Sequence, residues 1–139
     1  MSITGLGPHG ERAVPANQIV VTEQEAAEAR RRRFSVAVVL HTTTSDWSKQ
    51  QLAGIVTTLG RYSAVVIEVV DCAFDWRTQV DALERLSKSH VDAVISIPIG
   101  NAAVADAHRA ISHAGIKLIL MDNAPTGMLP SSDYATVVS

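Results

Sequence analysis

The sequence predicts an α/β fold, a doubly wound parallel sheet with helices on both faces. Apolar runs rich in β-branched residues recur roughly every 30 residues, the length of one strand–helix–strand unit. Polar residues follow each run, and a stretch with its apolar residues on one helical face comes next. Right-handed crossovers leave few topologies for such a chain. We therefore expect a three-layer α/β/α domain with the flavodoxin-like strand order 2-1-3-4-5.

Five strands are expected. The first is a continuous apolar run, typical of a strand that is buried on both faces. The second has Glu68 as its one polar residue, and the third ends at Pro98, which cannot donate a hydrogen bond to a sheet ladder. The expected strands span residues 34–40, 64–70, 93–97, 117–121 and 135–139.

Three amphipathic helices are expected between the first four strands. The residues that can cap the helix N-termini are Ser45 or Asp46 for the first and Asp75 for the second, and the glycines that can end helices are Gly60 and Gly115. The positions expected to face inward are, helix by helix, Leu52, Ile55, Val56 and Leu59; Trp76, Val80, Leu83 and Leu86; and Val104, Ala107, Ile111 and Ala114.

Residues 1–33 are expected to be an N-terminal tail with a short helix, which begins at a capping box of Thr22 and Glu25. The arginines at 30–33 suit the negative end of that helix dipole. Two other interpretations of this run are a basic region ahead of an export signal, even of the twin-arginine type, and a nucleic-acid patch. Only about seven apolar residues follow without a small-residue cleavage site, and the nearby glutamates weaken the nucleic-acid interpretation.

Composition limits the class of protein. The 139 residues, of which 47% are hydrophobic and 19% charged, are enough for one domain with a core, and the 4% aromatic content makes that core aliphatic. A net charge of −2 gives no general reason to expect nucleic acid or an anionic membrane as partner.

Cys72 is the only cysteine, which excludes an intrachain disulfide, and we expect it to be a buried apolar residue. No secretory signal starts at Met1, so we expect a cytoplasmic protein or one numbered without its leader.

The candidate site is the crevice where the strand order reverses, between the ends of the first and third strands. His41, the threonines that follow it, Pro98 and Asn101 should line this crevice. Asp122 and Asn123, after the fourth strand, can bind neighbouring hydroxyls, because a carboxylate accepts hydrogen bonds and an amide both donates and accepts.

Trp47 could offer a flat apolar face to a sugar ring. Each of these residues also has a structural interpretation: the tryptophan can pack against the sheet, the Asp–Asn pair can form a turn, the histidine can belong only to its loop, and the threonines can satisfy loop backbone.

Several enzyme classes lack their motifs here. The first loop has neither a dinucleotide-binding nor a P-loop glycine pattern, and no nucleophile elbow is present. A phospho-acceptor domain would need an aspartate where Pro98 stands, and residues 42–45 meet a flavodoxin-type phosphate loop only loosely. His108 and His113 are five apart, which does not suit a pair of metal ligands on one helical face. We expect these two histidines and His90 to lie on solvated faces, and we expect no metal, cofactor or catalytic residue.

Residues 34–139, about three quarters of the chain, resemble the N-terminal lobe of type I periplasmic binding proteins. These are the ribose-binding-protein-like sugar receptors of ABC transporters, and their fold is shared with lac-repressor-type effector domains. The segments that carry the resemblance are 35–40 with the loop to Trp47, 93–98 and 116–123. The resemblance implies ligand contacts by position at His41, Ser45, Trp47 and Asp122. Where the family often has arginine or a second aromatic residue, this chain has Asn123 and Ser48. The candidate ligand contacts are together His41, Thr43, Ser45, Trp47, Pro98, Asp122 and Asn123.

The resemblance also implies a function. It indicates a non-catalytic lobe that binds a carbohydrate or a similar small polar ligand, is periplasmic or extracellular, and is membrane-associated with an ABC-transporter permease in the intact protein. The alternatives are the effector-binding portion of a regulator, which the lack of a helix-turn-helix ahead of the domain disfavours, and a small flavodoxin-like enzyme. Ser139 lies near where the family's chain crosses to its second lobe, so we expect the C-terminal lobe to be absent and binding by this chain alone to be poor. A homodimer through the open sheet edge or the surface of the absent lobe is a further expectation, and nucleic acid is not an expected partner.

Overall fold

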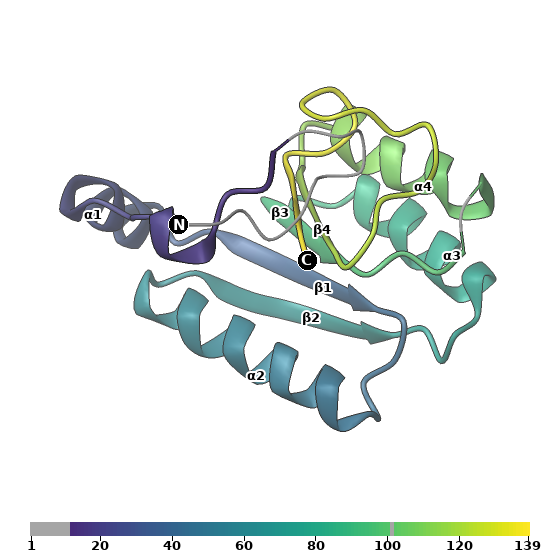
Figure 1. Ribbon diagram of the computed structural model, residues 1–139, viewed down its shortest axis with the longest axis horizontal. Helices are drawn as coiled ribbons and strands as arrows, with labels where there is room; N and C mark the ends of the chain where they lie inside the picture. Colours follow the sequence, from purple (N-terminus) through teal and green to yellow (C-terminus); the bar gives the residue numbers. More distant parts are fainter. Residues whose placement is uncertain (1–11, 101) are drawn as a thin grey trace.

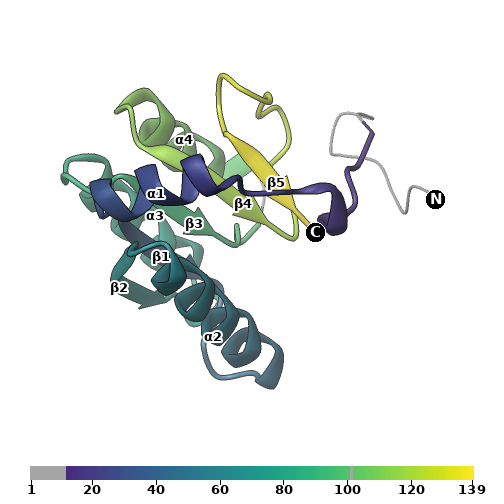
Figure 2. The same cartoon turned by 90° about the vertical axis from the view of Figure 1, so that its left-hand side faces the viewer.

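The computed structural model describes residues 12–100 and 102–139. Its centre is a five-stranded sheet of order β2-β1-β3-β4-β5 in which every neighbouring pair is parallel (Figure 1). The expected strand order is therefore confirmed. The strands are β1 (Ser35–Leu40), β2 (Val65–Asp71), β3 (Ala93–Ser96), β4 (Lys117–Met121) and β5 (Thr136–Val138). Figure 2, turned by 90°, shows β5 beside β4 at one edge of the sheet.

Helices cover both faces of the sheet, which confirms the three layers. The α-helices are α1 (Glu23–Arg32), α2 (Asp46–Arg61), α3 (Trp76–Ser87) and α4 (Ala102–His113), and a short 3₁₀ helix spans Ala16–Gln18. Figure 1 shows α2 on one side of β1 and β2, with α3 and α4 on the other side of the sheet. The expected caps Ser45 and Asp75 are the N-caps of α2 and α3, because each side chain accepts a backbone N–H of the first turn.

The core consists of two aliphatic clusters. The larger lies on the face covered by α3 and α4, and the smaller lies on the face covered by α2. Residues 36–40 of β1 are all buried, as their continuous apolar run predicts. Cys72 belongs to the larger cluster, as expected, and burial raises the pKa of its thiol to about 11.

Four details of the helix predictions are wrong. Val56 of α2 is 46% exposed, because the residues of α2 that pack on the sheet form a narrower stripe. Trp76, the first residue of α3, is 40% exposed and instead lies 4.6 Å from the Arg77 guanidinium. Ala114 is exposed beyond the end of α4, and Gly60 does not end α2, which continues for one more residue.

Helix α1 begins at the predicted capping box. Thr22 and Glu25 each accept the other's backbone N–H at 3.1 Å, and these bonds lower the pKa of Glu25. The last turn is basic, as predicted. There the Arg30 side chain donates to the carbonyl of Arg61 at 3.0 Å and lies over the ring of Tyr62. The boundary between a tail at 1–33 and a lobe at 34–139 stays a prediction, and residues 1–11 lie outside the described part of the chain.

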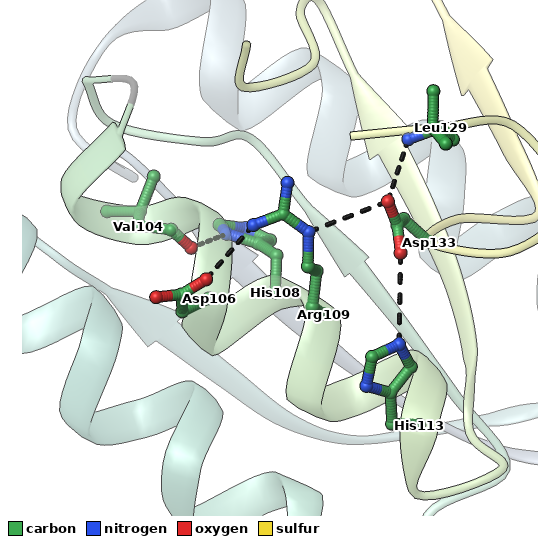
Figure 3. A network of polar contacts seen from close by, with 7 residues as sticks. All are labelled: Val104, Asp106, His108, Arg109, His113, Leu129 and Asp133. Carbon is green, nitrogen blue, oxygen red and sulfur yellow. Dashed lines mark hydrogen bonds and ion pairs between the residues drawn. The ribbon is translucent and has the colours of Figure 1, made fainter. Parts of the chain in front are cut away.

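A polar network fastens the loop between β4 and β5 to α4 (Figure 3). The carboxylate of Asp133 accepts the Leu129 N–H at 2.8 Å, and it lies 3.5 Å from Nε of Arg109 and 3.8 Å from Nε2 of His113. The Ser112 hydroxyl donates to the Asp133 carbonyl at 2.5 Å. This largely buried carboxylate therefore holds the chain in place just before it enters β5.

Candidate functional site

A hollow of about 410 Å³ lies at the carboxyl edge of the sheet. It is lined by residues from the loops that follow β1, β2, β3 and β4, together with the first turn of α2. The lining residues are His41, Trp47, Phe74, Ile97, Pro98, Ile99, Gly100, Asp122 and Asn123. The hollow is thus where a doubly wound sheet places its ligands, at the reversal of strand order between β1 and β3.

The structure brings five of the seven predicted site residues together here, namely His41, Trp47, Pro98, Asp122 and Asn123. The other two side chains make bonds within the protein. Thr43 donates its hydroxyl to Asp71 at 2.8 Å. Ser45 accepts the N–H of Ser48 at 3.1 Å, and its hydroxyl donates to that of Ser48 at 2.8 Å. The ligand role of all seven residues stays a prediction. Asn101, also expected at the crevice, lies outside the described residues.

Three aromatic rings form one side of the hollow. The ring centroid of His41 lies 5.9 Å from that of Trp47 and 5.2 Å from that of Phe74, and both pairs are edge-to-face. Trp47 is 46% exposed and Phe74 is 66% exposed. Nδ1 of His41 is buried without a hydrogen-bond partner among the described residues, so aromatic packing rather than this atom fixes the ring. Sequence reasoning missed Phe74, although its place in a loop at this same edge was a usable signal.

Two hydrogen-bonded loops hold Phe74 at the hollow. Ala73 and Phe74 adopt left-handed backbone angles, with φ of 50° and 58°. The Asp71 carboxylate accepts the Thr43 hydroxyl and the Ala73 N–H, both at 2.8 Å, and these two bonds lower its pKa. The Phe74 N–H donates to the carbonyl of His41 at 2.8 Å. The loop after β2 is therefore tied to the loop after β1.

The polar side of the hollow is formed by Asp122 and Asn123. Asp122 has φ of 73°, a conformation that aspartate tolerates better than most residues, and its N–H donates to the carbonyl of Val138 at 2.7 Å. The Asn123 amide donates to the Asp122 carboxylate at 3.2 Å and to the Pro98 carbonyl at 3.4 Å. A carboxylate and an amide are thus presented side by side, a set that binds hydroxyl groups.

Gln79 of α3 supports the hollow from behind. Its side chain is fully buried, its amide donates to the carbonyl of Ile97 at 2.9 Å, and its oxygen accepts the N–H of Ile99 at 2.8 Å. Both partners line the hollow. One buried side chain therefore satisfies the backbone where β3 has ended and no ladder is available.

His108 is buried, which corrects the expectation of a solvated face; His90 and His113 are exposed, as expected. His108 belongs to the inward-facing side of α4, one residue after Ala107 and four after Val104. That helical spacing could have predicted its burial from the sequence. Its Nδ1–H donates to the carbonyl of Val104 at 2.7 Å, which leaves Nε2 to accept the Ser96 hydroxyl at 2.9 Å. Burial lowers the pKa of His108 to about 4, so this imidazole is neutral at pH 7.

The part of the chain that the structure describes lacks two other kinds of site. None of its helices combines the length and apolar character that crossing a membrane requires. Residues 12–100 and 102–139 contain no group of three or more His, Cys, Asp or Glu side chains placed to hold a metal ion.

A comparison with known protein families shows to which family this chain belongs. The model of a periplasmic binding protein domain matches residues 36–139, which is well over half of the chain. The chain belongs to the periplasmic binding protein family. This family consists of binding proteins, so the resemblance seen in the sequence is confirmed at family level. No curated protein matches the sequence significantly.

Solved structures of periplasmic binding proteins share the fold. A sugar-binding protein of a sugar ABC transporter from Bacillus halodurans superposes with a TM-score of 0.62 at 17% identity, over 75% of this chain and 34% of its own. A solute-binding protein from Bacillus halodurans C-125 with bound myo-inositol gives 0.60 at 18% identity, over 68% and 33%. An arabinose-binding protein from Geobacillus stearothermophilus gives 0.61 at 19% identity, over 68% and 32%. The present chain therefore spans about a third of the length of these proteins.

Proposed function

We propose that this chain is a non-catalytic solute-binding lobe for a carbohydrate or a similar small polyhydroxylated ligand. The observation that carries the proposal is the hollow itself, which joins an exposed indole, Trp47, to the carboxylate–amide pair of Asp122 and Asn123. The C–H face of a sugar ring can stack on the indole while its hydroxyls hydrogen-bond to the pair.

The comparisons support this choice of ligand class. One structure that shares the fold contains myo-inositol and another is described as an arabinose-binding protein, and both ligands are small polyhydroxylated molecules. The proposal extends to delivery to an ABC-transporter permease and to a periplasmic or extracellular location with membrane association. It also includes a homodimer, through an open sheet edge or through the surface that would face a second lobe.

The proposed binding mode explains why affinity should be low for the chain by itself. In two-lobed receptors the ligand lies between lobes that close around it. The hollow would supply one wall of such a site, and it leaves the ligand exposed on its other side. We expect dissociation constants in the millimolar range for this chain, which corresponds to about −4 kcal/mol.

Titration of the ¹⁵N-labelled chain with myo-inositol and L-arabinose, followed by NMR, tests the proposal. We expect saturable amide shifts at the residues of the hollow. Trp47→Leu should weaken binding at least about tenfold because it removes the stacking surface. Trp76→Leu is the matched control, since this second exposed tryptophan does not line the hollow.

Two results would contradict the proposal. One is the absence of saturable shifts at the hollow with either ligand, although the spectrum shows a folded protein. The other is binding that Trp47→Leu and Trp76→Leu weaken equally, because the hollow would then not be the site.

A further inference from the structure

We propose that the ligand of this hollow carries a positive charge, as an amino sugar or aminocyclitol does. This inference rests on the proposed function and narrows its ligand class to polyhydroxylated rings that bear an ammonium group. Three independent features of the hollow support it: its charge balance, its uncovered aromatic rings and the capping of the helices that point at it.

The charge balance of the hollow is negative. Among its described lining residues there are one carboxylate, Asp122, one histidine, His41, and no lysine or arginine. The uncharged amide of Asn123 donates a hydrogen bond to that carboxylate. Asp122 takes part in no ion pair within the described part of the chain. Asp71, the last residue of β2, accepts hydrogen bonds from a hydroxyl and a backbone N–H, and His41 contributes a smaller electrostatic effect that also lowers its pKa.

Two exposed aromatic rings of the hollow differ from three rings elsewhere in the molecule. Outside the hollow, three rings each have an arginine over their face: Arg30 at 5.6 Å from Tyr62, Arg32 at 4.9 Å from Phe34 and Arg77 at 4.6 Å from Trp76. Within residues 12–100 and 102–139, no arginine or lysine lies over the rings of Trp47 or Phe74, both of which are exposed. Since an aromatic face attracts cations within about 6 Å, these two rings offer an unused cation-binding surface.

The helix N-termini at this edge of the sheet do not reverse the negative charge balance of the hollow. A helix N-terminus favours anions, and α2 and α3 both begin at the carboxyl edge of the sheet. Each already has its own cap, because Ser45 accepts an N–H of α2 and the Asp75 carboxylate accepts an N–H of α3. The anion-binding capacity of these two ends is therefore partly used by the chain itself.

A neutral sugar would meet this hollow at a disadvantage. It would remove water from the Asp122 carboxylate without supplying a countercharge, and burying an unpaired charge is unfavourable. An ammonium group would pair with that carboxylate and approach the faces of Trp47 and Phe74, while the remaining hydroxyls bind Asn123. One substituent would thus serve both sides of the hollow.

The test compares glucose, glucosamine and N-acetylglucosamine in the NMR titration, at a pH where the amine is protonated. We expect glucosamine to bind at least about tenfold more tightly than the two uncharged sugars at low salt. The ratio should fall toward one at roughly 1 M salt, where charges are screened within about 3 Å.

Asp122→Asn provides the decisive variant. Asparagine also tolerates a left-handed backbone, so the substitution removes the charge with little strain. It should bring glucosamine and glucose to nearly equal affinity. Asp81→Asn, which removes the same charge from an exposed position of α3, is the matched control and should leave the preference unchanged.

The outcomes separate the two proposals. If glucose binds as tightly as glucosamine, or if Asp122→Asn leaves the preference intact, the ligand is not selected by charge here and the inference is wrong while the proposed function stands. If neither these sugars nor myo-inositol shifts the signals of the hollow, the proposed function itself fails and the inference falls with it.

Discussion

The rim of the hollow and the support behind it are built in opposite ways. The rim comprises His41, Trp47, Phe74, Asp122 and Asn123, and the support comprises Gln79, Ser96 and His108. Rim side chains are exposed or half-buried. The three support side chains are fully buried, and each makes hydrogen bonds inside the protein.

Backbone strain follows the same division. Among the described residues, the non-glycine positions with positive φ are Arg33, Ser63, Ala73, Phe74, Asp122 and Ser131. Two of them, Phe74 and Asp122, belong to the rim, and Ala73 immediately precedes it. No support residue is among them. Binding sites often place strained backbone next to buried polar groups that are fully hydrogen-bonded, so that the geometry of the site is fixed at some cost in stability. Substitutions in the support should therefore change stability, and substitutions in the rim should change binding.

The largest expected effect is that of Gln79→Ala. The variant leaves the Ile97 carbonyl and the Ile99 N–H without their partner in a buried place, and it opens a small cavity. We expect it to lower the free energy of unfolding by about 3 kcal/mol. Urea denaturation measures the change. Gln50→Ala, at an exposed position of α2, should stay within about 0.5 kcal/mol; a similar loss in both variants would remove the contrast between support and surface.

The second prediction concerns pH. The pKa of His108 is about 4 in the folded protein against an ordinary value of 6.5, so the unfolded chain takes up this proton first. Stability should therefore be complete above pH 6.5 and fall as the pH drops toward 4, by about 3 kcal/mol in all. Glu68 and Asp71, whose pKa values are lowered, add losses only as the pH falls below their ordinary values of 4.5 and 3.8.

Denaturation curves between about pH 7 and pH 4.5 would show the effect of His108. His108→Gln should flatten the pH dependence, because glutamine cannot take up a proton. His90→Gln, at an exposed position, should keep the slope of the parent protein. An unchanged slope in His108→Gln would assign the acid sensitivity to other groups.

The smallest expected effect is a gain in stability beside the rim. Ala73 has φ of 50°, which costs alanine about 1–2 kcal/mol and glycine almost nothing. After the greater chain entropy of glycine in the unfolded state is subtracted, Ala73→Gly should stabilise the protein by about 0.5 kcal/mol. Ala103→Gly in α4 should instead cost about 1 kcal/mol. Thermal unfolding compares the two, and equal losses would show that the backbone beside the rim is not strained at Ala73.

The sheet could be predicted from the sequence because buried parallel strands appear as continuous apolar runs, and the crossover rule then fixes their order. The positions of the loop residues could not. The direction of Phe74 depends on two positive φ angles and on bonds to a loop that lies more than 30 residues earlier. The exposure of Val56 depends on how much of the sheet α2 covers, which no local pattern reveals.

Two hydrogen bonds join the loop after β1 to the end of β2 and the loop that follows it: Thr43 donates to Asp71, and Phe74 donates to His41. Ordering a residue costs about 1–2 kcal/mol of conformational entropy, and a binding site formed by two independent loops would incur that cost when the ligand arrives. Here the two loops are already fixed to each other as one body by folding. The aromatic side of the hollow is consequently preorganised, and a ligand meets a surface whose shape is set before contact.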